Sequence, residues 1–92
     1  MKIQINQHLP VRTNKDKGYC ILKINISRLV WNGKHMIMVI NDGKGNHVLN
    51  VRYKREGYGA TVPIADADQA ARAAVSFFEA VKAGLDSFEV QA

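Results

Sequence analysis

Residues 34–59 read KHMIMVINDGKGNHVLNVRYKREGYG, and this stretch decides the fold that the chain is expected to take. Residues 41–46, NDGKGN, are a group of Asp, Asn and Gly residues that tolerate the positive φ angles of tight turns. Ahead of this group, residues 34–40 are apolar on both faces, which is typical of a strand that is covered on both sides or that is central in its sheet. Behind it, residues 48–55 alternate between apolar and polar side chains. The stretch therefore predicts a β-hairpin.

The second strand of this hairpin has one apolar face and one polar face. The apolar set is Leu49, Val51 and Tyr53, and the polar set is Asn50, Arg52 and Lys54. Successive side chains of a strand point to opposite faces, so we expect the first set against the core and the second in water. Residues 54–59 then predict a charged, glycine-flanked loop, and residues 60–64 predict a short edge strand limited by Pro63.

The segment before the hairpin predicts two more strands separated by a loop. Residues 2–7 alternate and predict a short half-buried strand, whereas the polar residues 11–18 predict a mobile loop. Residues 19–26 predict a strand whose apolar set faces the core and whose polar set, including Lys23, faces away. The apolar set is Cys20, Leu22, Ile24 and Ile26.

A second hairpin is predicted directly ahead of the first. Asn32 and Gly33 separate two apolar stretches, and Asn-Gly is among the strongest short-range hairpin signals. The alternation breaks at residues 28–31, which is consistent with a β-bulge or bend before this turn.

The last third of the chain carries the pattern of an amphipathic helix at about 67–83. Asp66 is placed to cap its start, with Gln69 three residues later as in a capping box, and Gly84 follows its last turn. The expected inner stripe is Ala67, Ala70, Ala71, Ala74, Phe77, Phe78, Val81 and Leu85. The many alanines of this stripe let the helix approach a sheet closely, and the two phenylalanines are interpreted as core anchors.

Together these patterns predict an α+β fold, an antiparallel β-meander of three to five strands with one α-helix packed on one face. Phe88 and Val90 alternate after the helix and could add a last strand. Ninety-two residues are enough for one modest core, so we expect a single domain over residues 1–92.

The charge of the chain is unevenly distributed. The total is +5, but residues 1–60 hold 11 basic against 3 acidic side chains, a balance of +8, and residues 61–92 hold 2 against 5, a balance of −3. A one-sided positive field favours polyanions or acidic protein surfaces as partners. The alternative is that both signs simply keep a small protein soluble.

The sequence carries no catalytic or cofactor signature. It contains no phosphate loop, no dinucleotide fingerprint and no Gly-x-Ser-x-Gly motif. Its three histidines are scattered without the spacing of a metal site, and its single cysteine, Cys20, lies away from them. We therefore expect histidines at the surface or at strand ends, and a protein that is not an enzyme and needs neither cofactor nor metal.

The hydropathy of the chain predicts a cytoplasmic protein. No basic-then-apolar leader opens the sequence, and no apolar run approaches the roughly 20 residues of a membrane span. We therefore expect no membrane partner. If the chain is encoded by a phage, the compartment would be the host cytoplasm.

The sheet face opposite the helix is the expected binding surface. Basic and amide side chains in rows about 5 Å apart suit nucleic-acid phosphates and base edges. The candidate partner- or nucleic-acid-binding residues are Lys15, Lys17, Lys23, Arg28, Lys34, Asn50, Arg52, Lys54 and Arg55. The alternative is that any antiparallel sheet with one wet face carries polar residues there.

Residues 34–84 resemble the three-stranded-sheet-plus-helix module of the plant AP2 domain and of the arm-binding domain of phage integrases. The resemblance rests on the DGKGN turn, the basic strand that follows it and the helix DADQAARAAVSFFEAVKAGL. It implies a free-standing DNA-binding module that inserts a sheet face into the major groove. Of that family's arginine- and tryptophan-rich readout strands, only Arg52, Lys54 and Arg55 have counterparts, and residues 1–33 have no place in its pattern.

As a whole, the chain is similar in size and in sheet-plus-helix style to the small phage proteins that inhibit type I CRISPR surveillance complexes. No motif defines that group, so the resemblance assigns no residues. It implies a non-enzymatic anti-CRISPR inhibitor that docks on effector subunits near guide RNA and blocks nucleic-acid access, and this is our leading hypothesis. A third hypothesis, a small structural or subunit protein, would be marked by an exposed apolar patch.

Overall fold

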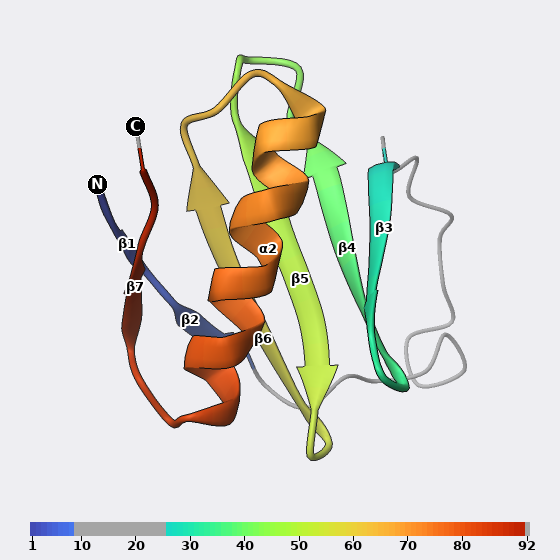
Figure 1. Cartoon of the computed structure of the whole chain (residues 1–92), viewed down its shortest axis with the longest axis vertical. Coiled ribbons are helices and arrows are strands. Elements are labelled where there is room, and N and C mark those ends of the chain that lie inside the picture. Colours follow the sequence, from blue (N-terminus) through green and yellow to red (C-terminus); the bar gives the residue numbers. More distant parts are fainter. Residues whose placement is uncertain (9–25, 92) are drawn as a thin grey trace.

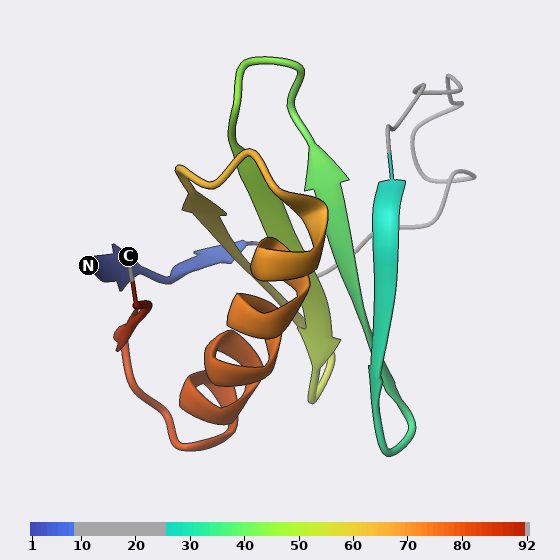
Figure 2. The ribbon, with the colours of Figure 1, turned by 45° about the horizontal axis from the view of Figure 1, so that its top comes forward.

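The described part of the protein consists of one antiparallel sheet with a helix on one face and a small second sheet at its side (Figures 1 and 2). The computed structural model describes residues 1–8 and 26–91. The predicted loop at 11–18 and most of the predicted strand at 19–26 lie outside these described residues.

Within the described residues, the larger sheet has five strands. From one edge to the other they are β2 (Asn6–His8), β6 (Glu56–Val62), β5 (His47–Tyr53), β4 (His35–Asn41) and β3 (Ile26–Asn32). Strands β3 to β6 form a meander, and β2 pairs with the far side of β6. The smaller sheet pairs β1 (Lys2–Gln4) with β7 (Ser87–Glu89). The predicted α+β meander with one covering helix and a last strand at Phe88 is confirmed.

The predicted first strand is divided between the two sheets. Residues 2–4 pair with β7, residues 6–8 pair with β6, and the backbone N–H of Ile5 between them donates to the carbonyl of Asp86 at 2.9 Å. The alternation of Ile3 and Ile5 continues through the break, so the sequence pattern does not reveal it. The N-terminal residues thereby connect the two sheets.

The strand predicted at 60–64 exists and ends before Pro63, but the loop predicted at 54–59 and the edge position of the strand are wrong. Residues 56–62 form β6, a full strand between β5 and β2, and the connection from β5 consists only of Lys54 and Arg55. Gly57 and Gly59 weaken a strand in isolation, but they pair with residues on both neighbouring strands. Sheet pairing overrides the local preference of the glycines.

Helix α2 (Ala67–Lys82) begins and ends as its sequence predicts. Asp66 caps it by accepting hydrogen bonds from the N–H groups of Asp68 and Gln69 at 2.8 and 3.1 Å. At the other end Gly84 takes a φ of +75°, and the N–H groups of Gly84 and Leu85 donate to the carbonyls of Val81 and Ala80. This pair of hydrogen bonds is the Schellman motif, which satisfies helix carbonyls that would otherwise lack a donor.

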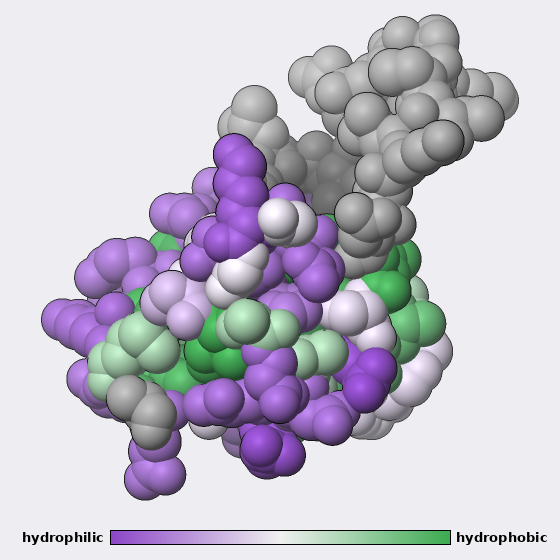
Figure 3. Space-filling view, turned by 90° about the horizontal axis from the view of Figure 1, so that it is seen from above, coloured by the Kyte–Doolittle hydropathy of each residue, from purple (hydrophilic) through white to green (hydrophobic). Residues whose placement is uncertain are grey.

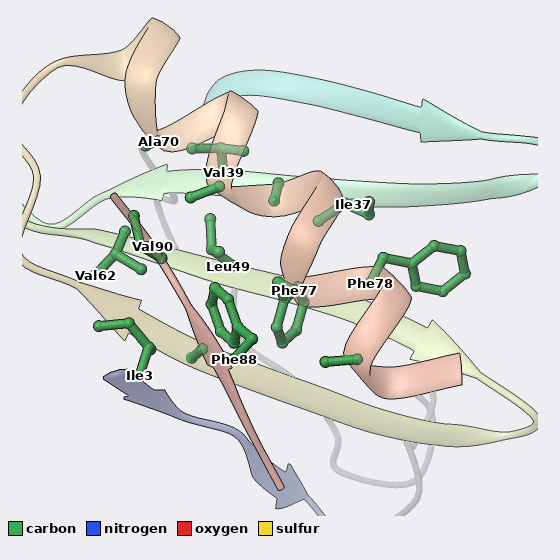
Figure 4. Close-up of a cluster of buried hydrophobic side chains, with 14 of the residues drawn as sticks. Ile3, Ile37, Val39, Leu49, Val62, Ala70, Phe77, Phe78, Phe88 and Val90 are labelled. Atoms are coloured by element: carbon green, nitrogen blue, oxygen red, sulfur yellow. The ribbon is translucent and has the colours of Figure 1, made fainter. Parts of the chain in front are cut away.

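The core lies between α2 and the sheet (Figure 4). Phe77 is fully buried, and its ring centroid lies 5.7 Å from that of Phe88 on β7. The buried helix residues are Ala70, Ala73, Ala74, Phe77, Phe78, Ala80 and Val81. Five residues of the predicted stripe are thus confirmed as buried, whereas Ala67 and Ala71 are half-buried. Leu85 is 58% exposed, because the helix ends before it and helical spacing no longer places it.

His47 lies at a strand end, as the sequence predicts, but it is buried and not at the surface. It is only 1% exposed, because it begins β5 on the helix-covered face that Leu49 continues. Its Nδ1 lies 2.6 Å from the carbonyl oxygen of Ile64, so Nδ1 carries the proton of this hydrogen bond. Among the described residues, Nε2 has no hydrogen-bond partner.

Replacing Phe77 with alanine should lower the free energy of unfolding by about 3–5 kcal/mol, because the side chain fills the space between α2 and β7. Urea unfolding followed by far-UV circular dichroism measures this loss. Val75→Ala on the same helix is the control, since Val75 is 46% exposed and should change stability by less than about 0.5 kcal/mol. Equal losses in the two variants would contradict the placement of α2.

Candidate functional site on the open sheet face

The face of β4 that points away from α2 is apolar and partly exposed. Ile37 and Val39 are fully buried against the helix, whereas Met36 on the other face is 37% exposed. Met38 and Ile40 on that face are half-buried. Of the two interpretations of residues 34–40, cover on both sides is wrong for the part of the chain that the structure describes. A central place in the sheet is confirmed, since β4 lies between β3 and β5.

Strand β3 adds larger apolar side chains to the same face. Leu29 is 50% exposed and pairs with Met38, and Trp31 is 64% exposed and pairs with Met36. Ile26 is 45% exposed, which contradicts the expectation that it faces the core.

A β-bulge explains this outcome for β3. The register shifts between Ile26 and Arg28, and the hydroxyl of the extra residue, Ser27, donates to the carbonyl of Val39 at 3.1 Å. A bulge exchanges the faces to which the following side chains point. Arg28 therefore lies on the helix side and Leu29 on the open side. The predicted irregularity exists, but it lies at the start of the strand and not before the turn.

We call this surface the apolar strip. Its exposed members are Ile26, Leu29, Trp31 and Met36, and its half-buried members are Met38, Ile40 and Val48. Contiguous exposed apolar surface of this kind marks interaction sites in proteins, and Trp and Met are enriched in the centres of protein interfaces.

Four cations gather at one end of the same sheet, and we call them the basic tip. Lys34 lies in the β3–β4 turn, Lys54 and Arg55 form the β5–β6 turn, and Arg52 lies near the end of β5. Both turns lie at the lower end of the sheet in Figure 1. Arg52 pairs with Gly57 and lies on the face opposite Tyr53, which is the face of the apolar strip. No ion pair joins any of the four to an acidic group among the described residues.

Aromatic rings on the helix side hold this end of the sheet together. The ring centroids of His35 and Tyr53 lie 5.3 Å apart, and each lies within 5.6 Å of the Phe78 ring. The Lys54 ammonium lies 5.4 Å from the centroid of the Tyr53 ring, and the Lys82 ammonium lies 5.2 Å from that of Phe78. Lys54 of the basic tip therefore packs against a cluster of aromatic rings.

The structure brings five of the nine predicted site residues to this region. Lys34, Arg52, Lys54 and Arg55 form the basic tip, and Asn50 is half-buried on the open face opposite Met38. Arg28 does not join them, because its guanidinium binds the Asp68 carboxylate on the helix side, with Nη2 2.6 Å from Oδ1. The predictions for Lys15, Lys17 and Lys23 lie outside the described residues.

The apolar strip is the part of the site that the sequence did not reveal. The sequence pattern places Leu29 and Trp31 at a bulge or bend and Met36 on a strand with two apolar faces, and it does not group the three on one exposed surface. One signal was available, since residues 34–40 offer two apolar faces and a single helix covers only one face of a sheet. Because the two apolar faces outnumber the one face that a helix can cover, the second apolar set is expected on the open face.

The shifted pKa values in the described residues have local structural causes. Hydrogen bonds from the Asn46 side chain and the Lys44 backbone hold the pKa of Asp42 below its usual value within the 41–46 turn. The backbone N–H groups of Gln69 and Asp68 lower the pKa of Asp66 at the helix cap. Burial, followed by the charge of Glu56, raises the pKa of Tyr58. The three pKa shifts thus arise from the 41–46 turn, from the cap of α2 and from the contact between Tyr58 and Glu56 on β6.

Other surfaces of the described region are less distinctive. The end with the β4–β5 turn and the start of α2 is mostly hydrophilic around a small apolar centre (Figure 3). A cleft of about 520 Å³ lies between α2 and β7, where Arg72, Ser76 and Glu89 are all exposed. Over residues 1–8 and 26–91, no three His, Cys, Asp or Glu side chains are grouped to hold a metal ion.

No helix in the described part of the chain is long and apolar enough to cross a membrane. Comparisons of the chain with protein-family models, curated proteins and solved structures found no match. The functional argument therefore rests on the chemistry of the open face.

Trp31 is the only tryptophan of the chain, so its fluorescence reports on the apolar strip. Because Trp31 is 64% exposed, we expect an emission maximum close to that of tryptophan in water and ready quenching by iodide. The Trp31→Phe variant gives the background emission that remains without tryptophan. A blue-shifted, protected emission would contradict an open strip. In that case the emission would be measured again after dilution. A second copy that covers Trp31 dissociates on dilution and the protection is lost, whereas protection by the same chain persists.

Proposed function

We propose that this chain is a non-enzymatic, phage-type inhibitor that docks on a nucleic-acid-processing complex, a CRISPR surveillance complex, and blocks access of nucleic acid. The observation that supports the proposal is the juxtaposition of the apolar strip with the basic tip, which lies at one end of the same sheet and has Arg52 on the same open face. An apolar centre with a charged margin is the composition of protein-docking surfaces.

The apolar strip supplies the protein-binding part of this surface. Trp31 and Met36 are paired across β3 and β4, so a partner pocket can enclose both at once. Binding energy in interfaces is concentrated in a few such anchors, with tryptophan the most frequent among them. Both side chains are already exposed in the free protein, and removing them from water would stabilise a complex.

The basic tip suits the nucleic acid that such a complex holds. Its four cations have no acidic partner in the described residues, so their charge remains available to an outside anion. The phosphates of a guide RNA provide that anion close to protein subunits. A chain that binds both the protein subunits and the guide RNA occupies the space where a target strand would pair with the guide. Inhibition then follows from steric occlusion and requires no catalytic step.

A subunit or structural protein is the second candidate that the apolar strip favours, because an exposed apolar patch also marks a permanent assembly interface. The basic tip beside the strip favours the inhibitor, since permanent interfaces are more hydrophobic than those of partners that also exist apart. The two functions differ in outcome, because only the inhibitor lowers target binding by the complex.

Trp31→Ala should weaken capture of a purified type I surveillance complex by about 2 kcal/mol or more, which is the usual effect of removing an interface anchor. Surface-immobilised complex loaded with guide RNA measures the affinity, and a labelled target duplex measures inhibition. Leu85→Ala is the matched control, because Leu85 is also exposed but lies after α2, away from the open face.

Absence of capture by the unaltered protein, with target binding unaffected, would refute the proposal. Capture without any loss of target binding would instead support the subunit. Equal capture by the Trp31 and Leu85 variants would refute the apolar strip as the docking surface.

A free-standing DNA-binding module remains the alternative function, supported by Asn50 and Arg52 on the open face. Arg52→Glu should then abolish sequence preference for a duplex while thermal stability changes by less than about 0.5 kcal/mol, because Arg52 is exposed. Fluorescence anisotropy with duplexes of different sequence measures this effect, and Arg72→Glu on α2 is the control. Absence of any sequence preference in the unaltered protein would exclude this alternative.

A further inference from the structure

The β5–β6 turn has a backbone conformation that its residues disfavour. Lys54 and Arg55 have φ angles of +50° and +68°, the signature of a two-residue type I′ turn. Such turns strongly prefer Asn-Gly, because a side chain with a β-carbon is crowded at positive φ. They are the only non-glycine residues with positive φ among the described residues.

Elsewhere the same chain meets this requirement with glycine. The neighbouring β3–β4 turn places Gly33 at a φ of +62°, the 41–46 turn uses Gly43 and Gly45, and the helix ends at Gly84. Over residues 1–8 and 26–91, glycine is thus used wherever the backbone has a positive φ except at one turn, and that turn carries two adjacent cations. Strained backbone that the surrounding structure maintains is concentrated at functional sites.

Nothing within the described residues neutralises these cations. Lys54 rests on the Tyr53 ring, and neither Lys54 nor Arg55 forms an ion pair there. By contrast, Lys82 nearby pairs with Glu79 at 2.8 Å, and Arg28 pairs with Asp68. The turn therefore keeps two charges exposed in a conformation that neither residue prefers.

We propose that this turn, together with Lys34 and Arg52, is a direct contact site for the sugar-phosphate backbone of a nucleic acid. The two turns of the basic tip lie about two strand spacings apart, or roughly 10 Å. Duplex DNA carries one negative charge per about 1.7 Å of its axis, so a row of this width meets several phosphates. Lysine and arginine contacts to phosphate position a protein on nucleic acid without reading sequence.

This inference rests on the proposed function, because it identifies the part of the inhibitor that would contact the nucleic acid of the surveillance complex. It assigns the cations to phosphate and leaves the apolar strip to protein. Either RNA or DNA can supply the phosphates, and the two are separated by the experiment below.

The test is the double variant Lys54→Asn/Arg55→Gly, which removes both charges and installs the preferred turn residues. Its affinity for a labelled single-stranded RNA and for a DNA duplex of mixed sequence is measured by anisotropy over a range of KCl concentrations. The slope of log affinity against log salt should become shallower by about 1.8 with the duplex or about 1.4 with the single strand. Its urea midpoint should rise above that of the unaltered protein.

The matched control is Lys2→Gln/Lys44→Gln, which lowers the net charge equally at exposed positions away from the basic tip. It should keep the slope of the unaltered protein with both nucleic acids. Equal slopes in the two double variants, or no salt-dependent binding by the unaltered protein, would overturn the proposal. Capture of the surveillance complex without any such slope refutes this contact alone, whereas the slope without capture refutes the proposed function.

Discussion

The packing of α2 against β4 and β5 is the interaction on which the rest of the structure depends. Ala70, Ala73 and Ala74 keep the helix axis close to the sheet, and Phe77 fills the space that remains. A sixteen-residue helix can cover only one face of a five-stranded sheet. The same packing that forms the core therefore leaves the second apolar set of β4 on the opposite face, where Met36 is available to a partner.

One inserted residue determines the character of that open face. Without the bulge at Ser27, the alternation of β3 would continue, and Arg28 and Val30 would share the open face with Ile26. With it, Arg28 reaches Asp68 across the helix side, and Leu29 and Trp31 join the methionines. The bulge therefore separates the surface into an apolar part along β3 and β4 and a charged part at the turns.

Features with a local cause could be predicted from the sequence, and features that depend on pairing between distant segments could not. Asp66, the Asn-Gly signal at 32–33 and the alanine stripe each act within a few residues, so the helix and the hairpins were predicted, although the β3–β4 turn consists of Gly33 and Lys34, one residue later than expected. Gly57 and Gly59 made residues 56–59 resemble a loop, although these residues belong to β6 and pair with residues of β2 and β5. Of the candidate site, the cations of the turns were predicted because charge is visible in the sequence. The apolar strip was missed because an apolar side chain was assumed to be buried.

The division of the N-terminal residues between two sheets has a consequence for folding. Strands β3 to β6 pair with their neighbours in sequence, but β1 pairs with β7 across nearly the whole chain and β2 pairs with β6 across half of it. Contacts of long sequence separation form late because their loop-closure entropy opposes them. The strands β1 and β2, which come first in this sequence, are thus the last to find their partners. Until β2 arrives, β6 has a free edge, and crowding of nascent chains favours its pairing with the wrong molecule.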